Sequence, residues 1–133
     1  MPPSDEVYRT IKDLRDGNLE ERREAAEKLS QFGDRGTIPI LLDQLKNETN
    51  PQTRIYIIQS LAGIGDISST TKIEKIAFED ENNDVKSAAI EALANFRQTS
   101  STFILNQIVM NSAFSPRIRE EASRAIGIIE GYA

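Results

Sequence analysis

Apolar residues recur along this chain with two periods. Within short segments they follow an i, i+4, i+7 spacing, as in Ile57, Leu61 and Ile64, which predicts amphipathic α-helices. Over longer distances the pattern returns about every 32 residues, because Leu29, Leu61 and Leu93 lie 32 positions apart. A repeat of roughly 20–50 residues is typical of a solenoid, in which each unit buries its apolar face against its neighbours. No segment shows sustained period-two alternation, so no sheet is expected.

Residues that cap helices recur with the same period. Ser, Thr, Asp and Asn favour the position before a helix, where their side chains accept hydrogen bonds from unpaired backbone N–H groups. Two columns of such residues are found, the first being Asn18, Asn50, Asn82 and Ser115 and the second Ser4, Thr37, Ser69 and Ser101. Pro51 and Pro116 follow two of these caps, at the first helical position that proline favours. Eight caps predict eight helices, arranged as four hairpins.

We name the two helices of each hairpin A and B. The expected A helices span residues 5–16, 38–47, 70–80 and 101–111, and the B helices 19–31, 51–63, 83–96 and 116–130. The predicted repeats cover residues 4–33, 34–65, 66–98 and 99–133 of a single domain, 1–133. Gly33 and Gly65 are expected to close their B helices in a left-handed conformation. Arg97 stands at that place in the third repeat, so its turn is expected to close differently.

The apolar spacing also predicts which side chains are buried. In the A helices these are Val7, Ile11 and Leu14; Ile38, Leu41, Leu42 and Leu45; Ile73, Ile76 and Ala77; and Phe103, Ile104, Leu105, Ile108 and Val109. In the B helices they are Ala25, Leu29 and Phe32; Ile57, Leu61 and Ile64; Val85, Ala89, Leu93 and Phe96; and Ile118, Ala122, Ile126 and Ile129.

The composition limits the possible functions. The 133 residues include 21 acidic and 16 basic side chains, a net charge of −5, whereas nucleic-acid binders usually carry a basic excess. No apolar run approaches the ~20 residues of a membrane span, and the first residues do not resemble a secretory signal. We therefore expect a cytoplasmic protein without nucleic-acid or membrane partners.

The chain contains no cysteine, histidine or tryptophan. Without cysteine it has no disulfide, thiolate nucleophile or thiolate metal site. Without histidine it lacks the commonest general base and the commonest transition-metal ligand. These absences favour a protein that is not an enzyme and that holds no cofactor.

The B helices carry a motif that begins with an apolar and a basic residue. Two variable positions and an alanine follow, then two more variable positions, a second alanine and a final apolar residue. It is read in residues 85–93, VKSAAIEAL, and in residues 118–126, IREEASRAI. This motif resembles a HEAT repeat, specifically the short HEAT-like type named after phycobilisome lyases, over nearly the whole chain. The resemblance implies an all-α, right-handed α-solenoid of about four HEAT-like hairpins.

In that family an acidic residue before helix B and a basic residue within it tend to bond between adjacent repeats as a ladder. The matching positions here are acidic Asp16, Glu48 and Asp80, and basic Arg22, Arg54, Lys86 and Arg119. Ala113 departs from the acidic column. The resemblance implies the ladder role for the matching residues only.

Members of the family hold partners in a groove lined by B helices. The groove candidates are Arg23, Ile55, Ser87 and Glu120 in one column, and Glu27, Gln59, Glu91 and Arg124 in another. Ile55 and Tyr56 have no evident place in the buried stripe. They are expected either to pack between repeats or to form part of a partner interface.

Three further segments admit two interpretations each. Residues 79–84, EDENND, are rich in cation-binding oxygens, but they coincide with the turn and cap before a B helix, which is the favoured interpretation. The charge run in residues 20–28 predicts a solvated helix face, or an electrostatic rim around a partner site. Ile128 and Tyr132 either pack onto the preceding helix or leave an apolar end through which two copies dimerise.

The sequence thus favours a non-catalytic scaffold or adaptor that binds a protein partner on its B-helix groove. The alternative, implied by the family name, is an accessory subunit for attaching bilin to phycobiliproteins or removing it. HEAT-like enzymes that bind iron through His–Glu pairs are excluded because the chain has no histidine. The basic, aromatic-rich groove of HEAT-like DNA glycosylases does not fit the composition.

Overall fold

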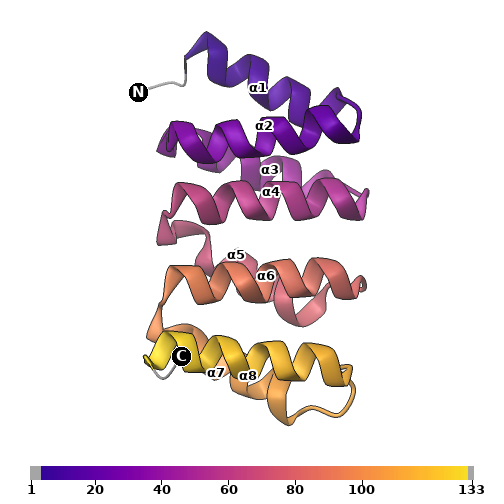
Figure 1. Ribbon diagram of the computed structural model, residues 1–133, viewed down its shortest axis with the longest axis vertical. Coiled ribbons are helices and arrows are strands. Elements are labelled where there is room, and N and C mark those ends of the chain that lie inside the picture. Colours follow the sequence, from indigo (N-terminus) through magenta and orange to yellow (C-terminus); the bar gives the residue numbers. More distant parts are fainter. Residues whose placement is uncertain (1–3, 132–133) are drawn as a thin grey trace. The chain divides into compact units, whose positions relative to one another are not determined.

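The computed structural model describes residues 4–131, which form eight α-helices and three short 3₁₀ turns, with no strand among them (Figure 1). The all-α fold of eight repeating helices expected from the sequence is confirmed. The helices are α1 (Asp5–Asp16), α2 (Leu19–Phe32), α3 (Ile38–Asn47), α4 (Pro51–Ile64), α5 (Thr70–Glu79), α6 (Asn83–Phe96), α7 (Thr102–Met110) and α8 (Pro116–Glu130). Their ends differ from the expected ones by at most one residue. Within residues 4–131 no helix combines the length and the apolar character that a membrane crossing requires.

The chain divides into two compact units. The N-terminal unit ends at Ser69 and contains α1–α4, and the C-terminal unit begins at Thr70 and contains α5–α8. In each unit the A helix of a hairpin packs against its B helix, and the two B helices, α2 with α4 and α6 with α8, also pack together (Figure 1). The single domain and the repeat boundaries expected from the sequence stay predictions.

The caps of the B helices lie where the sequence places them. The Asn18 side chain accepts from the Glu21 backbone N–H at 2.9 Å, and the Glu21 side chain accepts from the Asn18 N–H at 3.1 Å, which completes a capping box. The side chains of Asn50, Asn82 and Ser115 also accept from backbone N–H groups and so cap α4, α6 and α8. These bonds satisfy N–H groups that a helix start leaves unpaired, so they fix where each B helix begins.

The second column of predicted caps is only partly correct. Ser4 caps α1, but Thr37 and Ser101 make no such bond and lie buried, as does Ser69. Their hydroxyl groups donate elsewhere: Thr37 to the Asp34 carbonyl at 2.7 Å and Ser69 to the Asp66 carbonyl at 3.3 Å. The reason is that a 3₁₀ turn precedes each of the later A helices, and the hydroxyl groups of Thr37 and Ser69 close their turns, whereas that of Ser101 donates to the Glu74 carboxylate of α5 at 2.8 Å.

Asp34 and Asp66 immediately precede two of these 3₁₀ turns. Each carboxylate accepts from the backbone N–H two residues ahead, at 2.8 Å from Gly36 and 2.8 Å from Ser68. The hydrogen bond from the Ser68 backbone lowers the pKa of Asp66. The charged form of this side chain is therefore the one that suits the turn.

The helix ends contradict one prediction. Arg97 adopts the same left-handed conformation, φ 53°, as Gly33 (φ 58°) and Gly65 (φ 78°). Its N–H donates to the Leu93 carbonyl at 3.2 Å, as the N–H of Gly33 donates to Leu29 at 3.3 Å. The path of the chain into the next A helix requires this conformation, so arginine adopts it despite the steric cost of its Cβ.

Most of the predicted core is buried, with two clear errors. Phe32 is 38% exposed at the end of α2, and Phe103 is 71% exposed on α7. Several other members of the predicted stripe are only half-buried: Leu42, Ile64, Ile76, Ile104, Val109, Ile126 and Ile129. Conversely, Ala26 and Ile90 are buried although they lie beside the stripe. Within each unit a B helix packs against its A helix and against the other B helix, so its buried face is wider than one stripe.

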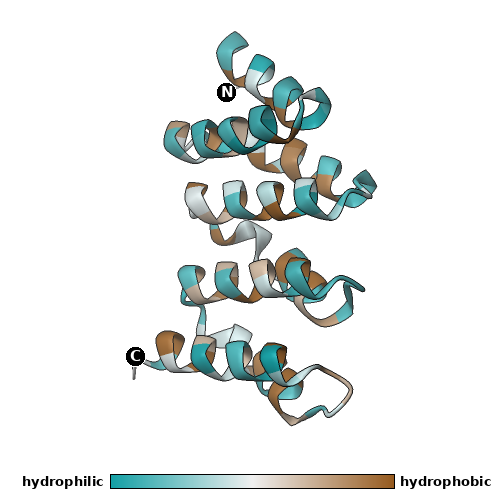
Figure 2. Cartoon of the chain, turned by 45° about the vertical axis from the view of Figure 1, so that its right-hand side comes forward, coloured by the Kyte–Doolittle hydropathy of each residue, from teal (hydrophilic) through white to brown (hydrophobic). Residues whose placement is uncertain are grey.

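In the N-terminal unit α2 and α4 approach closely because small residues meet. A Cβ placed on Gly63 of α4 would lie only 2.3 Å from the Ser30 Oγ of α2. The Ser60 hydroxyl donates to the Ala26 carbonyl of α2 at 3.2 Å. Figure 2 shows hydrophilic residues over most of α1 and α2, so the apolar residues of these helices are concentrated on the packed side.

We expect Gly63→Ala to destabilise the protein by about 1–2 kcal/mol, because the added methyl group overlaps Ser30. The matched control is Gly127→Ala in α8, where the added Cβ meets nothing within 4 Å. That control should stabilise the protein by up to about 1 kcal/mol through helix propensity alone. Urea unfolding followed by circular dichroism measures both. An equal gain in the two variants would contradict the close approach of α2 and α4.

Candidate functional site

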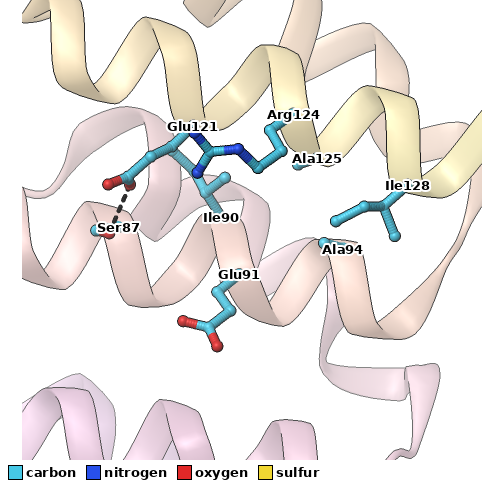
Figure 3. A pocket seen from close by; sticks show the side chains of 8 residues that line it. All are labelled: Ser87, Ile90, Glu91, Ala94, Glu121, Arg124, Ala125 and Ile128. Carbon is cyan, nitrogen blue, oxygen red and sulfur yellow. Dashed lines mark hydrogen bonds between the residues drawn. The ribbon is translucent and has the colours of Figure 1, made fainter. Parts of the chain in front are cut away.

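A pocket of about 280 Å³ opens between α6 and α8 of the C-terminal unit (Figure 3). We call it the α6–α8 pocket. Four residues of each helix line it: Ser87, Ile90, Glu91 and Ala94 from α6, and Glu121, Arg124, Ala125 and Ile128 from α8. Because these residues recur at helical spacing, each helix turns one continuous face toward the pocket.

The floor of the pocket is apolar. Ile90, Ala94 and Ala125 are almost completely buried, and Ile128 is half-buried. Figure 3 shows Ala94 and Ile128 facing one another from the two helices, with Ile90 nearer the polar end. The last turn of α8, beside the C label in Figure 2, is correspondingly hydrophobic.

A comparison with the equivalent positions of the N-terminal unit suggests a reason for the α6–α8 pocket. One repeat pair earlier in sequence, Ser30 and Gly63 occupy the positions that Ala94 and Ile128 occupy in the C-terminal unit. Gly63 has no side chain and lies directly against Ser30. Ile128 is a large, branched residue, and its side chain requires room between the helices. The same register that closes α2 on α4 therefore leaves a pocket between α6 and α8.

The polar rim of the pocket is partly fixed by hydrogen bonds. The Ser87 hydroxyl donates to the Glu121 Oε2 at 2.5 Å across the two helices (Figure 3). Arg117 lies between the two helices as well, with its Nη2 3.2 Å from the Asp84 Oδ1 and its Nε 3.8 Å from the Glu121 Oε1. These contacts tie the N-terminal parts of α6 and α8 together and hold the Glu121 carboxylate at one end of the pocket.

The other rim charges are exposed. The Arg124 Nη2 lies 3.4 Å from the Glu120 Oε1, and the two side chains are 63% and 74% exposed. Glu91 is exposed as well, and in Figure 3 its carboxylate points away from the floor. Exposed ion pairs of this kind contribute little stability, so they rearrange at low cost.

The structure brings some of the predicted groove residues together. Ser87, Glu91 and Arg124 line the α6–α8 pocket, and Glu120 pairs with Arg124 beside it. The predictions missed the apolar floor, because Ile90, Ala94 and Ala125 lie beside the predicted stripe. Ile128, for which packing onto the preceding helix and an apolar end were both open, is half-buried and forms part of the floor. Tyr132, named with it, lies outside the described residues.

The groove candidates of the N-terminal unit form a different kind of surface. Arg23 binds Glu20 at 2.5 Å and Glu27 at 3.2 Å along the exposed side of α2. Its hydrogen bond lowers the pKa of Glu20, and the carboxylate in turn raises the pKa of Arg23. These exposed, paired side chains fit a solvated helix face, and the alternative of an electrostatic rim around a partner site stays a prediction.

On α4, Gln59 is exposed, while Ile55 and Tyr56 are half-buried. Half-burial fits both of the interpretations given above. The role of these three residues stays a prediction.

The oxygen-rich segment 79–84 acts as a turn and a cap. The Asp80 carboxylate accepts from the Asn82 N–H at 3.0 Å, and Asn82 caps α6. In the described part of the chain, no three acidic side chains gather closely enough to hold a metal ion.

The three arginines of the predicted ladder share a local role. Arg22 donates to the Gly17 carbonyl at 2.7 Å, Arg54 to the Leu45 carbonyl at 2.7 Å, and Arg119 to the Phe114 carbonyl at 3.1 Å. Each arginine thus stabilises the A–B turn of its own hairpin by binding a backbone oxygen. This contact gives a local reason for an arginine in the first, second and fourth repeats.

Arg22 also makes a contact between repeats. Arg22 Nη1 donates to the Thr53 hydroxyl of the next B helix. Asp16 is exposed and binds Arg15, and Glu48 accepts from the Asn50 N–H at 3.0 Å. The acidic-to-basic ladder, including Arg54 and Asp80, stays a prediction.

Lys86 shows how the chain compensates for a missing acidic residue. Ala113 occupies the acidic position of the fourth repeat, and the next residue, Phe114, is buried in the turn. The Lys86 Nζ lies 4.7 Å from the centre of the Phe114 ring, and the Phe78 ring of α5 meets the same ring edge-on at 5.2 Å. A cation–π contact stands here in place of an ion pair.

The hairpins, the caps and the B-helix motif agree with a comparison to known families. Residues 9–94 match the family described as HEAT repeats. The chain belongs to the HEAT-repeat family. HEAT repeats commonly mediate protein–protein interactions. The matched residues reach the Ala94 side of the α6–α8 pocket, while α8 continues the same hairpin and cap pattern beyond the match. No curated protein matches the chain.

We expect Phe114→Ala to destabilise the fold by about 3 kcal/mol, because it removes a buried ring that contacts α5 and α6. The cation–π part is isolated by a double-mutant cycle of Lys86→Met and Phe114→Leu, with an expected coupling of about 0.5–1 kcal/mol. Chemical denaturation of the four proteins measures it. Lys86→Arg is the control that keeps the charge over the ring. Strict additivity of Lys86→Met and Phe114→Leu would show that the contact contributes nothing.

Proposed function

We propose that this HEAT-repeat chain is a non-catalytic protein-binding module that captures a partner polypeptide in its α6–α8 pocket. The observation that carries the proposal is an apolar floor enclosed by a charged rim. Binding surfaces commonly combine a buried apolar centre with a polar edge. The family membership supports the same class of function.

The size of the pocket favours an anchor residue as its occupant. About 280 Å³ is at the lower limit of pockets that hold small-molecule ligands, and it is open to solvent. One large apolar side chain on a partner fills such a space and covers the half-buried Ile128. A few anchors of this kind dominate the affinity of many protein interfaces.

The rim charges favour a basic neighbour for that anchor. Around the pocket the acidic side chains outnumber the basic ones, four to three, as Asp84, Glu91, Glu120 and Glu121 against Arg97, Arg117 and Arg124. Arg117 and Arg124 are already paired with Asp84, Glu121 and Glu120. Glu91 is therefore the rim charge best placed to receive a lysine or arginine of the partner.

The function is tested with an array of short peptides that combine one Leu, Phe or Met with neighbouring basic or acidic residues. We expect the basic peptides to bind, and Ala94→Leu to abolish their binding because the added side chain fills the floor. Glu91→Lys should weaken binding by about threefold or more, since rim charges mainly alter association. Glu27→Lys, at the matching position of α2, is the control and should leave binding unchanged.

Two results would refute the proposal. One is peptide binding that survives Ala94→Leu in a protein whose circular dichroism is unaltered. The other is equal weakening by Glu91→Lys and Glu27→Lys, which would indicate nonspecific attraction to an acidic protein.

The phycobilisome-lyase repeat type and its bilin-related role remain an alternative that rests on the B-helix motif alone. Titration with free bilin, followed by its absorbance spectrum, tests that alternative separately. A spectral shift that Ala94→Leu abolishes would favour bilin over a peptide as the occupant of the pocket.

A further inference from the structure

The outer face of α7 is the most exposed apolar surface in the described part of the chain. Phe103 is 71% exposed and Met110 is 84% exposed, the two largest values among the large apolar side chains of residues 4–131. They lie seven residues apart, which places them on one face of the helix. Asn106 and Gln107 lie between them and are exposed as well. We call these four residues the α7 face.

This face also lacks charge, which is unusual for this chain. Residues 98–116 contain no Asp, Glu, Lys or Arg, although 28% of the whole sequence is charged. The exposed sides of the other A helices carry charges, for example Lys12 on α1, Asp43 on α3 and Lys75 on α5. Exposed apolar side chains on a face without charges are typical of an interaction surface, and Phe103 and Met110 lie on such a face.

We propose that the α7 face is the contact surface of a twofold-symmetric homodimer. Two chains that each carry a net charge of −5 repel one another, so the favoured contact between copies is one that contributes no charge. The uncharged α7 face meets that condition, because neither copy desolvates an ion there and no like charges meet.

The order of residues on the α7 face is self-complementary. When two α7 helices pack antiparallel, a twofold axis between Asn106 and Gln107 places Phe103 of one copy against Met110 of the other. A thioether against an aromatic ring is a favourable contact, and it occurs twice. Near the axis, the amide side chains of Asn106 and Gln107 have donors and acceptors to exchange.

The contact is short, which sets its strength. α7 has nine residues, so two such helices bury less surface than a permanent dimer does. We expect a reversible dimer with a micromolar dissociation constant. None of the four α7-face residues lines the α6–α8 pocket, so a dimer presents two open pockets and binds a bivalent partner more tightly than a monomer does.

Sedimentation velocity over a concentration series tests the self-association. The wild-type chain should shift from monomer to dimer, and Phe103→Glu or Met110→Glu should weaken the dimer by about tenfold or more, because each places two charges in the contact. Ile67→Glu is the matched control, since Ile67 is 53% exposed and lies in the other unit. Thermal unfolding should be unchanged in all three variants, because the replaced side chains are exposed.

The antiparallel register has a test of its own. Phe103→Glu combined with Met110→Lys pairs opposite charges across the axis and should restore the dimer, whereas Phe103→Glu combined with Met110→Glu should not. The chain has no cysteine, so Gln107→Cys introduces the sole thiol and should form an interchain disulfide on mild oxidation. Asn95→Cys, exposed on α6, is the collision control.

The proposal is overturned by a wild-type chain that stays monomeric throughout, or by a dimer that Phe103→Glu leaves intact. Equal cross-linking of Gln107→Cys and Asn95→Cys would also overturn it. The register is wrong if the opposite-charge pair associates no better than the like-charge pair. None of these outcomes depends on peptide binding, so this inference and the proposed function fail or succeed separately.

Discussion

The structure depends on one packing requirement, that a B helix buries its apolar side against two neighbours. Its own A helix covers one part of that side, and the other B helix of the same unit covers another, as Ala26 shows in α2 and Ile90 in α6. This requirement favours a constant repeat length, because every hairpin has to bring its B helix into an equivalent position. The asparagine and serine caps serve it by fixing where each B helix begins.

The distance between two B helices follows from a few side chains at the shared face. Gly63 against Ser30 brings α2 and α4 together, whereas Ile128 opposite Ala94 holds room between α6 and α8. Core side chains pack to nearly uniform density, so one change from glycine to a branched residue has to appear as displaced backbone or as a pocket. The proposed binding site is thus a product of sequence variation inside a regular repeat, and the regular positions supply its frame.

The fold was largely predictable because helix period, caps and repeat length are local properties of the sequence. The positions that failed depend on tertiary surroundings. Thr37 and Ser69 resemble helix caps, but a 3₁₀ turn uses their hydroxyl groups, and Arg97 takes a conformation set by the chain path around it. Of the pocket, the rim residues Ser87, Glu91 and Arg124 were predictable because they lie off the buried stripe. The floor was not, because the sequence does not state which face of α6 meets α8.

The uneven distribution of charge gives the C-terminal unit two surfaces of different character. The rim of the α6–α8 pocket carries an acidic excess and suits a basic partner, while the α7 face carries no charge and suits a copy of itself. A charged face and a neutral face on one small unit do not compete for the same ligand, since each disfavours what the other binds. Selectivity of this kind requires no extra domain. It follows from nineteen consecutive residues without charge, 98–116, in a chain whose other A helices carry exposed charged side chains.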